Sequence, residues 1–380
     1  MSHKRAATNR SATALPWRLT LATLLALVLT SCGGASSSST PAAQPGGSAS
    51  RAYVSNYGSG AGQTLTGYSI SSTNGNLLGF DLSVIKVPPG PTSLSSDGTG
   101  KYLYVGNQGG VISGYSIDAA TGSLTELASS PYGAGRNVNF LTVDSSAKYL
   151  FSVDNLLSTV WPFTITAGVL SAVAPSGTVP SYGFTPAPPV SATVDPLLRN
   201  LYVPMGAAGT EVFHISSGAL LDAGTIPPTP GAESQFVAIE RTGRFAYIAD
   251  GVSGVSIYFI DPATGNLTLM TALPLATGSH PTRITLTPDS RYLYVANQGD
   301  GTVAQFAVSS GGGLVSIGAN LMAGNQPVAM SIDPAGMYLY VANQGSDTVT
   351  IFRISAIDGT LTVQAPASTG PSPSAIVIVP

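Results

Sequence analysis

Four titratable side chains are the residues of this chain best able to do chemistry. His280 and Arg283 are separated by only Pro281 and Thr282. Imidazole and carboxylate side chains can remove a proton from water, and a guanidinium can stabilise an oxyanion or a carboxylate. The sequence therefore offers one candidate catalytic group, which consists of His280, Arg283, Arg136 and Glu233.

Three Asn-Gln pairs form a second set of candidates, because amides both donate and accept hydrogen bonds. The pairs are Asn107 with Gln108, Asn297 with Gln298, and Asn343 with Gln344. Each pair follows an apolar run that is typical of a strand. Asn and Asp side chains also hydrogen-bond the backbone of their own turns. Ligand binding and turn formation therefore both explain these pairs, and turn formation explains the Asn residues more simply.

These candidates belong to a sequence that repeats itself from residue 51, and three markers keep the same order and spacing. The first is an aromatic-apolar strand that begins at Tyr53, Tyr104, Phe151, Tyr202, Tyr247, Tyr294 and Tyr340. The second is a later aromatic residue, found at Tyr68, Tyr115, Phe163, Phe213, Tyr258, Phe306 and Phe352. The third is Gly-x-Leu, which begins at Gly75, Gly122, Gly168, Gly218, Gly265, Gly312 and Gly359. A fixed period of 40–50 residues is typical of repeat architectures.

Each repeat predicts four short antiparallel strands joined by tight turns. In the clearest copy these are residues 328–332, 338–342, 348–354 and a strand from Thr360, with a turn at Asp333-Pro334-Ala335-Gly336. The repeat at residue 51 lacks a first strand, and residues 373–378 resemble one. We therefore predict an all-β, seven-bladed propeller over residues 51–380, closed by the C-terminal strand.

The meander predicts which loops share a face. Loops after each second strand and before each first strand lie on one side, which we call the loop face. This face is expected to carry Arg136, Asn137, Asn139, Glu233, His280, the three Asn-Gln pairs, Asn56, Asn155 and Asp250. Loops on a rigid scaffold often carry function. His280 next to a Pro also fits a structural role, and His214 is expected at the surface of a third strand.

Arg283 is the strongest departure from the repeat. The aligned residues in the other copies are Ser93, Phe140, Ser191, Phe236, Ala329 and Ala375. A charge at such a position is costly to bury unpaired. Arg283 therefore requires a bound anion or an ion pair across neighbouring blades, for which Glu233 is the candidate partner.

The strand pattern Tyr-Leu-Tyr-Val-Ala-Asn, which occurs at residues 292–297 and again at 338–343, resembles the lactonase and YVTN propeller families. These families include 6-phosphogluconolactonase and carboxymuconate cyclase. The resemblance implies a channel-mouth site of His, Arg and Glu, with Pro-Arg-His opening an inner strand. Here the equivalent stretch is His280-Pro281-Thr282-Arg283, and Gln108, Gln298 and Gln344 stand where the family has Glu after a strand.

The N-terminal segment predicts export. Residues 1–18 are basic, and Leu19–Leu29 is almost wholly apolar but too short to span a membrane. Leu29-Thr30-Ser31-Cys32-Gly33 resembles the lipobox of bacterial lipoproteins, which implies cleavage after residue 31 and a lipid on Cys32. Residues 32–50 are then a lipidated Cys and a flexible Ser/Pro/Gly tether. Localisation is predicted as lipid-anchored to the bacterial cell envelope, on the outer membrane or the periplasmic face if the source is Gram-negative.

Composition limits the partners. All 18 acidic residues but only 11 of the 15 basic ones follow Cys32, which gives that part of the chain a formal net charge of −7. This balance disfavours a nucleic-acid partner. No metal site and no cofactor motif are expected, and we expect a monomer. The sequence favours an envelope-anchored module that binds a small ligand or an envelope protein at the loop face. The alternative is a lactone hydrolase resembling 6-phosphogluconolactonase.

Overall fold

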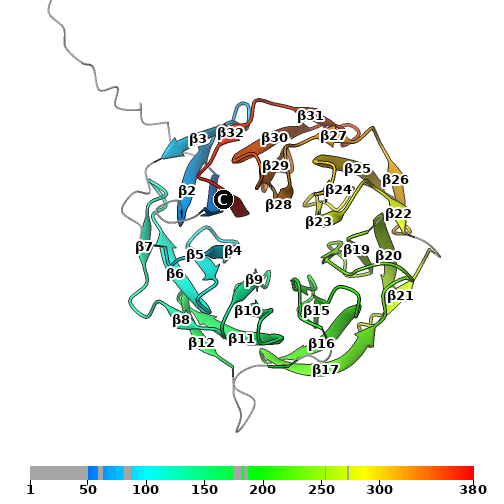
Figure 1. Ribbon diagram of the computed structural model, residues 1–380, viewed down its shortest axis with the longest axis horizontal. Coiled ribbons are helices and arrows are strands. Elements are labelled where there is room, and N and C mark those ends of the chain that lie inside the picture. Colours follow the sequence, from blue (N-terminus) through cyan, green and yellow to red (C-terminus); the bar gives the residue numbers. More distant parts are fainter. Residues whose placement is uncertain are drawn as a thin grey trace, which may run out of the picture. The chain divides into compact units, whose positions relative to one another are not determined.

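Seven antiparallel sheets surround a central channel (Figure 1). The computed structural model describes residues 50–58, 63–80, 87–173, 182–183, 187–252, 254–271 and 274–380, and these contain strands but no helix. The predicted all-β, seven-bladed propeller is confirmed. The predicted leader, Cys32 and nearly all of the tether lie outside the described residues.

The blades follow one another along the chain. From the channel outward, blade 1 contains β33 (Pro373–Val379), β1 (Arg51–Tyr57), β2 (Gln63–Ile70) and β3 (Leu77–Phe80). Blade 2 contains β4 (Pro91–Ser96), β5 (Tyr102–Asn107), β6 (Val111–Ile117), β7 (Leu124–Glu126) and β8 (Tyr132–Gly133). Blade 3 contains β9 (Val138–Val143), β10 (Tyr149–Asp154), β11 (Thr159–Thr166), β12 (Val169–Ala172) and β13 (Tyr182–Gly183). Blade 4 contains β14 (Thr193–Val194), β15 (Asn200–Pro204), β16 (Thr210–Ser216) and β17 (Ala219–Ile226).

The last three blades share one pattern. Blade 5 contains β18 (Phe236–Ile239), β19 (Phe245–Ala249), β20 (Gly254–Ile260), β21 (Leu267–Leu269) and β22 (Leu275–Ala276). Blade 6 contains β23 (Pro281–Leu286), β24 (Tyr292–Asn297), β25 (Thr302–Val308), β26 (Leu314–Ser316) and β27 (Leu321–Met322). Blade 7 contains β28 (Pro327–Ile332), β29 (Tyr338–Asn343), β30 (Thr348–Ile354), β31 (Leu361–Val363) and β32 (Ala367–Ser368).

The C-terminal strand closes the ring, as predicted. β33 pairs antiparallel with β1, and Ile378 lies opposite Ala52 while Ile376 lies opposite Val54. The last strand of the chain is therefore the innermost strand of the first blade. Blade 1 gains a fourth strand, and no open blade remains in the array.

The fourth strand differs from the expectation of one continuous strand. In blades 2, 3, 5, 6 and 7 it is divided into two short strands that both pair with the third strand. The sequence has a Pro or Gly between the two parts in each of these blades, including Pro131, Pro274, Gly318 and Pro366. Proline removes a ladder donor, and glycine weakens a strand, so the outer edge is interrupted there.

The first sequence marker forms the contacts between blades. Six of its seven residues are fully buried tyrosines, and each hydroxyl donates to a Gly carbonyl of the next blade. The bonds are Tyr53 to Gly122 (2.7 Å), Tyr104 to Gly168 (3.0 Å), Tyr202 to Gly265 (2.8 Å), Tyr247 to Gly312 (3.0 Å), Tyr294 to Gly359 (2.7 Å) and Tyr340 to Gly75 (2.8 Å). The seventh marker residue is Phe151, which has no hydroxyl. The acceptor glycines are the third sequence marker, so two markers of the repeat are bonded to each other.

These marker glycines combine a positive φ with a lack of space for a side chain, and only glycine tolerates both. Gly359 has a φ of 74°, and a Cβ built there would lie 2.2 Å from Cδ1 of Tyr292 in the preceding blade. A positive φ costs little only for glycine, and the close approach leaves no space for a methyl group. Gly75 and Gly312 meet Tyr338 and Phe245 in the same way.

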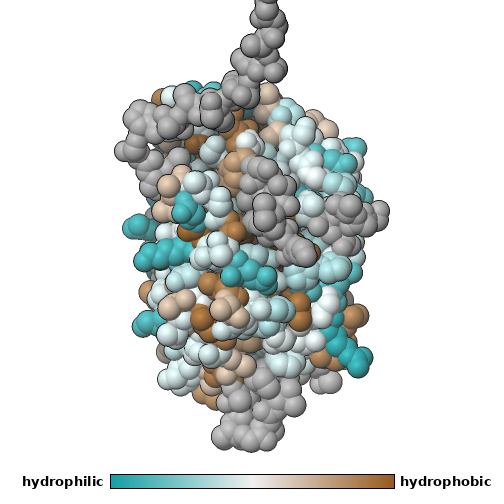
Figure 2. Space-filling view, turned by 90° about the vertical axis from the view of Figure 1, so that its left-hand side faces the viewer, coloured by the Kyte–Doolittle hydropathy of each residue, from teal (hydrophilic) through white to brown (hydrophobic). Residues whose placement is uncertain are grey.

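The rim of the propeller carries single exposed hydrophobic residues rather than one patch. Leu78, Leu221, Leu269, Val315 and Val363 lie on the outer strands of five different blades. Figure 2 shows one side of this rim, where hydrophobic and hydrophilic residues are interspersed. Scattered surface hydrophobics of this kind are ordinary.

We predict that Gly359→Ala destabilises the propeller far more than Gly98→Ala. Both glycines have a positive φ (74° and 69°), but the space around Gly98 is open. Gly98→Ala is expected to lower the free energy of unfolding by about 1 kcal/mol, the cost of a left-handed backbone. Gly359→Ala adds the overlap with Tyr292, about 1–3 kcal/mol more. Chemical denaturation measures both, and equal losses would contradict the interblade contact.

The buried tyrosines predict a loss of stability in alkali. Burial raises the pKa of Tyr53, Tyr68 and Tyr115 to about 12, whereas an unfolded tyrosine ionises near pH ~10. Because the folded state favours the neutral phenol, this stabilisation is complete below pH ~10 and is lost as the pH rises toward the folded pKa. We expect the free energy of unfolding to fall over that interval, with tyrosinate absorbance appearing mainly on unfolding. Ionisation near pH ~10 in a folded protein would contradict this.

Candidate functional site

The channel is lined by one position of the repeat, at or near the start of each inner strand. In β23 this residue is Arg283, which lies opposite Ala296, and the corresponding register holds for Phe236 and Ala249. The other residues of this position are Ser93, Phe140, Ser191, Ala329 and Ala375. Six of the seven line a cavity of about 110 Å³ in the channel. The alignment of repeats alone identified this position, but not that it faces the channel.

Arg283 lies between two aromatic rings. Its Cζ atom is 5.6 Å from the ring centroid of Phe236 in the neighbouring blade and 5.9 Å from that of Phe140 in blade 3. These distances are within the range of cation–π contact. The two phenylalanines also contact each other edge to face, with centroids 6.0 Å apart. The guanidinium is therefore held in a fixed place across the channel.

The positive charge of Arg283 is not neutralised by a neighbouring acid. Its Nη1 donates to the carbonyl of Thr282 at 2.8 Å, and burial lowers its pKa to about 10. Within the described part of the chain the only ion pair joins Arg199 and Asp195. The alternative of an ion pair with Glu233 is therefore wrong. Glu233 is exposed and accepts a long 3.5 Å bond from the amide of Gln235.

His280 and Glu233 lie at the channel mouth on adjacent blades. Each stands just before an inner strand, and each side chain is exposed. The turn between β19 and β20 links them through the backbone: the Glu233 amide donates to the Asp250 carbonyl at 2.7 Å, and the Gly251 amide donates to the Pro281 carbonyl at 3.2 Å. His280 and Glu233 are thus placed near each other, with Arg283 two to three residues deeper in the channel.

The backbone at His280 is a repeated structural feature. Its φ is 54°, and its carbonyl accepts a 2.9 Å bond from the amide of Gln298. Gln326 and Ser372 hold the same place in blades 7 and 1, with φ values of 52°. The local backbone therefore does not depend on histidine, and the imidazole is free to act on a ligand.

Arg136 lies apart from the other candidates, before the inner strand of blade 3. Its side chain is exposed, and its backbone amide is bonded to the Asp154 carboxylate. The neighbouring Asn137 donates to Asn155 at 2.6 Å, and Asn139 donates to the Val190 carbonyl at 2.8 Å. Arg136 is thus on the loop face, but blade 4 separates it from Glu233.

The three Asn-Gln pairs divide into buried and accessible members. Asn107, Asn297 and Asn343 are 0% exposed, whereas Gln108 is exposed and Gln298 and Gln344 are half-buried. The Asn297 amide donates to Thr302 Oγ1 at 3.0 Å and accepts from Thr277 Oγ1 at 3.0 Å. A ligand on the loop face would meet the glutamines and not the asparagines, whose hydrogen bonds hold the loops.

Three neighbouring loops form a shallow polar groove on the loop face between blades 6 and 7. Its volume is about 430 Å³, and its side chains come from Gln298, Asp300, Asn325 and Gln326. Gly299, Gly301 and Gly345 complete it. The sequence identified Gln298 as a candidate here but not Asp300, Asn325 or Gln326, because the loop before each inner strand varies between repeats.

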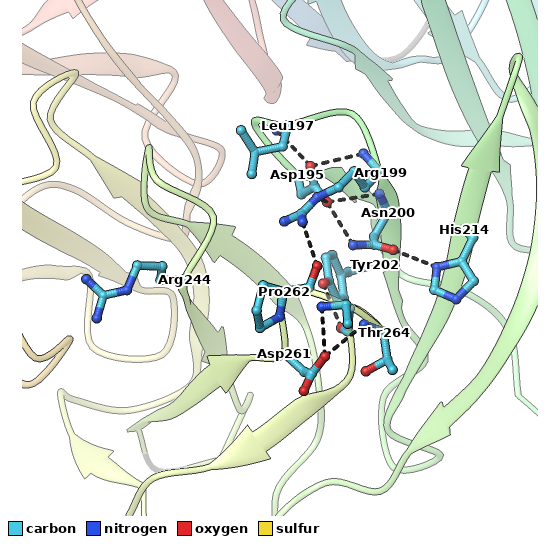
Figure 3. Close-up of polar contacts among 12 residues, drawn as sticks. Asp195, Leu197, Arg199, Asn200, Tyr202, His214, Arg244, Asp261, Pro262 and Thr264 are labelled. Atoms are coloured by element: carbon cyan, nitrogen blue, oxygen red, sulfur yellow. Dashed lines mark hydrogen bonds and ion pairs between the residues drawn. The ribbon is translucent and has the colours of Figure 1, made fainter.

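His214 is not a free surface residue, contrary to expectation. It is half-buried on β16, and its Nδ1 lies 2.8 Å from Oδ1 of Asn200, whose amide donates to Asp195 at 2.9 Å (Figure 3). Arg199 in the same cluster donates to the Pro262 carbonyl of blade 5 at 2.7 Å. This network lies at the strand ends opposite the loop face, where it joins blades 4 and 5.

The described ranges show neither a metal-binding cluster nor a membrane-spanning helix. No group of three or more His, Cys, Asp and Glu side chains is placed to hold a metal ion there. In that same part of the chain, no helix is long and apolar enough to cross a membrane.

A family model named lactonase, 7-bladed beta-propeller, matches residues 51–378. The chain belongs to this family. A 6-phosphogluconolactonase of Bacillus subtilis (strain 168) is 27% identical over 133 residues, which are 33% of this chain and 36% of that protein. The match therefore spans about a third of that relative.

Solved structures of similar proteins share the fold of this lactonase-family chain. A candidate 6-phosphogluconolactonase from Bacteroides fragilis NCTC 9343 has a TM-score of 0.76 and 22% identity, with 88% of this chain and 98% of that chain covered. The periplasmic gluconolactonase of Pseudomonas aeruginosa has a TM-score of 0.75 and 22% identity, with coverages of 87% and 99%. At this identity the likeness concerns the fold.

We predict that Asn297→Ala lowers stability and that Gln298→Ala does not. Loss of the Asn297 amide leaves the hydroxyl and the carbonyl of the buried Thr277 without this partner, which costs about 1–3 kcal/mol. Gln298 is half-buried and lines only the polar groove, so its replacement should change the free energy of unfolding by less than about 0.5 kcal/mol. Chemical denaturation of the two variants tests this. An Asn297→Ala variant as stable as the parent would return this residue to the ligand candidates.

Proposed function

We propose that this lactonase-family propeller hydrolyses a lactone at the mouth of its channel. The observation that carries the proposal is the placement of His280 and Glu233 on adjacent blades above the unpaired cation of Arg283. Membership of the lactonase family and the names of its relatives support the reaction class.

The reaction needs a base, a water molecule and a stabilised oxyanion. His280 or Glu233 removes a proton from water, and the resulting hydroxide oxygen attacks the ring carbonyl. The acyl carbon–oxygen bond then breaks, the ring oxygen takes up a proton, and a hydroxy acid leaves as a carboxylate. A cation near the carbonyl stabilises the negative charge that develops on oxygen. Arg136 and Arg283 are the loop-face and channel candidates for this role.

The substrate is proposed to be an unphosphorylated lactone outside the cytoplasm. The basic, apolar leader and Cys32 support export and attachment to the envelope by a lipid. A phosphorylated sugar lactone is a cytoplasmic metabolite, so it would not meet an exported enzyme. The Pro-Thr-Arg order at residues 281–283 also differs from the Pro-Arg-His that the family resemblance implies.

Ligand binding without catalysis is the second candidate function. The observation that favours it is the polar groove of about 430 Å³ between blades 6 and 7. Its amide side chains and backbone can donate to and accept from a sugar-like or peptide-like ligand. In this case the loop face would bind a small ligand or an envelope protein, and His280 would have no catalytic role.

We predict that the full-length protein opens lactones and that His280→Ala loses this activity. A panel of unphosphorylated and phosphorylated lactones is incubated with enzyme, and acid release is followed by titration at constant pH. Removal of a general base should lower kcat/KM by about 100-fold or more. Glu233→Gln is tested beside Glu126→Gln, which changes an exposed carboxylate on β7.

Gln326→Ala is the matched control for His280→Ala. Both residues are exposed, precede a Pro and have nearly the same positive φ, so both variants carry the same backbone cost. If hydrolysis takes place at the channel mouth, His280→Ala loses turnover and Gln326→Ala keeps it. No turnover of any lactone, or equal activity in the two variants, would remove the hydrolase proposal and leave binding.

A further inference from the structure

Within the described residues, the guanidinium of Arg283 has hydrogen-bond donors that no other group accepts from. Arginine carries five N–H donors, and the single bond found for this side chain goes to the Thr282 carbonyl. The rings of Phe236 and Phe140 flank the charge but accept no conventional hydrogen bond. A buried charge without a counter-ion is unfavourable unless a ligand or water supplies the missing contacts.

The channel leaves space on one side of this cation only. Phenylalanines occupy the equivalent position in blades 3 and 5, whereas Ala329, Ala375 and Ser93 occupy it in blades 7, 1 and 2. The cavity of about 110 Å³ is bounded by the small residues, the phenylalanines and Arg283 itself. The cavity lies where the repeat position has small side chains rather than phenylalanines.

The volume of this cavity limits its ligand to a small molecule or group. A water molecule occupies ~30 Å³ in the liquid, so the cavity holds a group of only a few heavy atoms. Pockets that enclose a whole organic ligand are larger, about 300–1,000 Å³. A complete sugar lactone therefore does not fit beside Arg283, but a small oxyanion does.

The polar groups of the cavity favour a ligand with a negative charge. Ser93 Oγ accepts a 2.9 Å bond from the Leu141 amide, and no acceptor is found for its own hydrogen within the described residues. Ser374 differs, because its hydroxyl is engaged with the Pro91 carbonyl at 2.7 Å. None of the residues that line the cavity is acidic. The Thr92 hydroxyl likewise donates to a carbonyl, that of Gly106, at 3.1 Å, so Arg283 and the Ser93 hydroxyl are the donors that remain for a ligand in this cavity.

We infer that the channel contains a binding site for a small carboxylate, held between the Arg283 guanidinium and the Ser93 hydroxyl. A carboxylate matches the two parallel N–H donors of a guanidinium. Its methyl or other small substituent would contact Ala329 and Ala375. The site lies below the channel mouth and does not depend on hydrolysis there. The carboxylate has two sources, a free small acid or the carboxylate end of an opened lactone.

Calorimetric titration of sodium acetate into the full-length protein tests the site. We expect saturable binding to the parent, at least a 100-fold loss of affinity in Arg283→Met, and a several-fold loss in Ser93→Ala. Arg241→Met is the matched control, because it removes an exposed arginine from the turn between β18 and β19 and should change affinity less than 3-fold. No saturable binding to the parent, or equal binding by Arg283→Met, would overturn the inference.

The thermal midpoint distinguishes a lost site from a lost fold. Without acetate, Arg283→Met should melt at or above the temperature of the parent, because an unpaired cation is replaced by an apolar side chain of similar length. With acetate, the midpoint should rise in the parent and in Ser93→Ala at higher concentration, but not in Arg283→Met. If Arg283→Met fails to fold, Ser93→Ala decides: an unchanged acetate affinity in that variant rejects the site.

The same measurements separate this site from the proposed hydrolysis. His280→Ala should bind acetate as the parent does, whether or not any lactone is turned over. The ring-opened hydroxy acids of the lactone panel are titrated beside acetate to identify the source of the carboxylate. Binding of the hydroxy acids with loss in Arg283→Met indicates a product site, and binding of acetate alone indicates a site for a free small acid.

Discussion

The hydrogen bond from a buried tyrosine to a glycine carbonyl of the next blade determines how this propeller is assembled. It occurs at six of the seven blade junctions, and the bond from Tyr340 to Gly75 joins the last blade to the first. The glycine is obligatory because an aromatic or other long side chain lies against its Cα. A repeated bond of this kind sets the rotation between blades, and hence which residues of each inner strand face the channel.

Because the junctions are equivalent, the function of the chain depends on the residues that differ between blades. Six copies of the channel position are Ser, Ala or Phe, and only one is charged. Phe140 and Phe236 fill one side of the channel and hold Arg283, while the small residues leave the cavity open on the other side. The site therefore results from an asymmetric set of side chains on a nearly symmetric backbone.

The fold could be predicted from the sequence because its markers are periodic and each reports a local constraint. The predicted role of the loop Asn residues was weaker, since Asn297 and Asn343 have the residue type of a ligand but the burial of a structural group. Of the two partners considered for Arg283, a bound anion and Glu233, the second is wrong for a related reason. Glu233 comes before the inner strand of blade 5, and the register places Phe236, three residues later, at the level of Arg283. The depth of a residue in the channel follows from the register in which the strands pair, and the amino-acid composition does not show that register.

The position of the cation distinguishes this chain from the pattern that its family resemblance implies. In Pro-Arg-His the arginine follows the proline directly, whereas here Thr282 intervenes before Arg283. Successive strand residues point in opposite directions and are ~3.3 Å apart. A register shift between Pro281 and Arg283 interrupts this alternation here, and Arg283 lies opposite Ala296 at the level of the channel cavity. A ligand that contacts both His280 and Arg283 must extend into the channel, and the small cavity there admits only its anionic end.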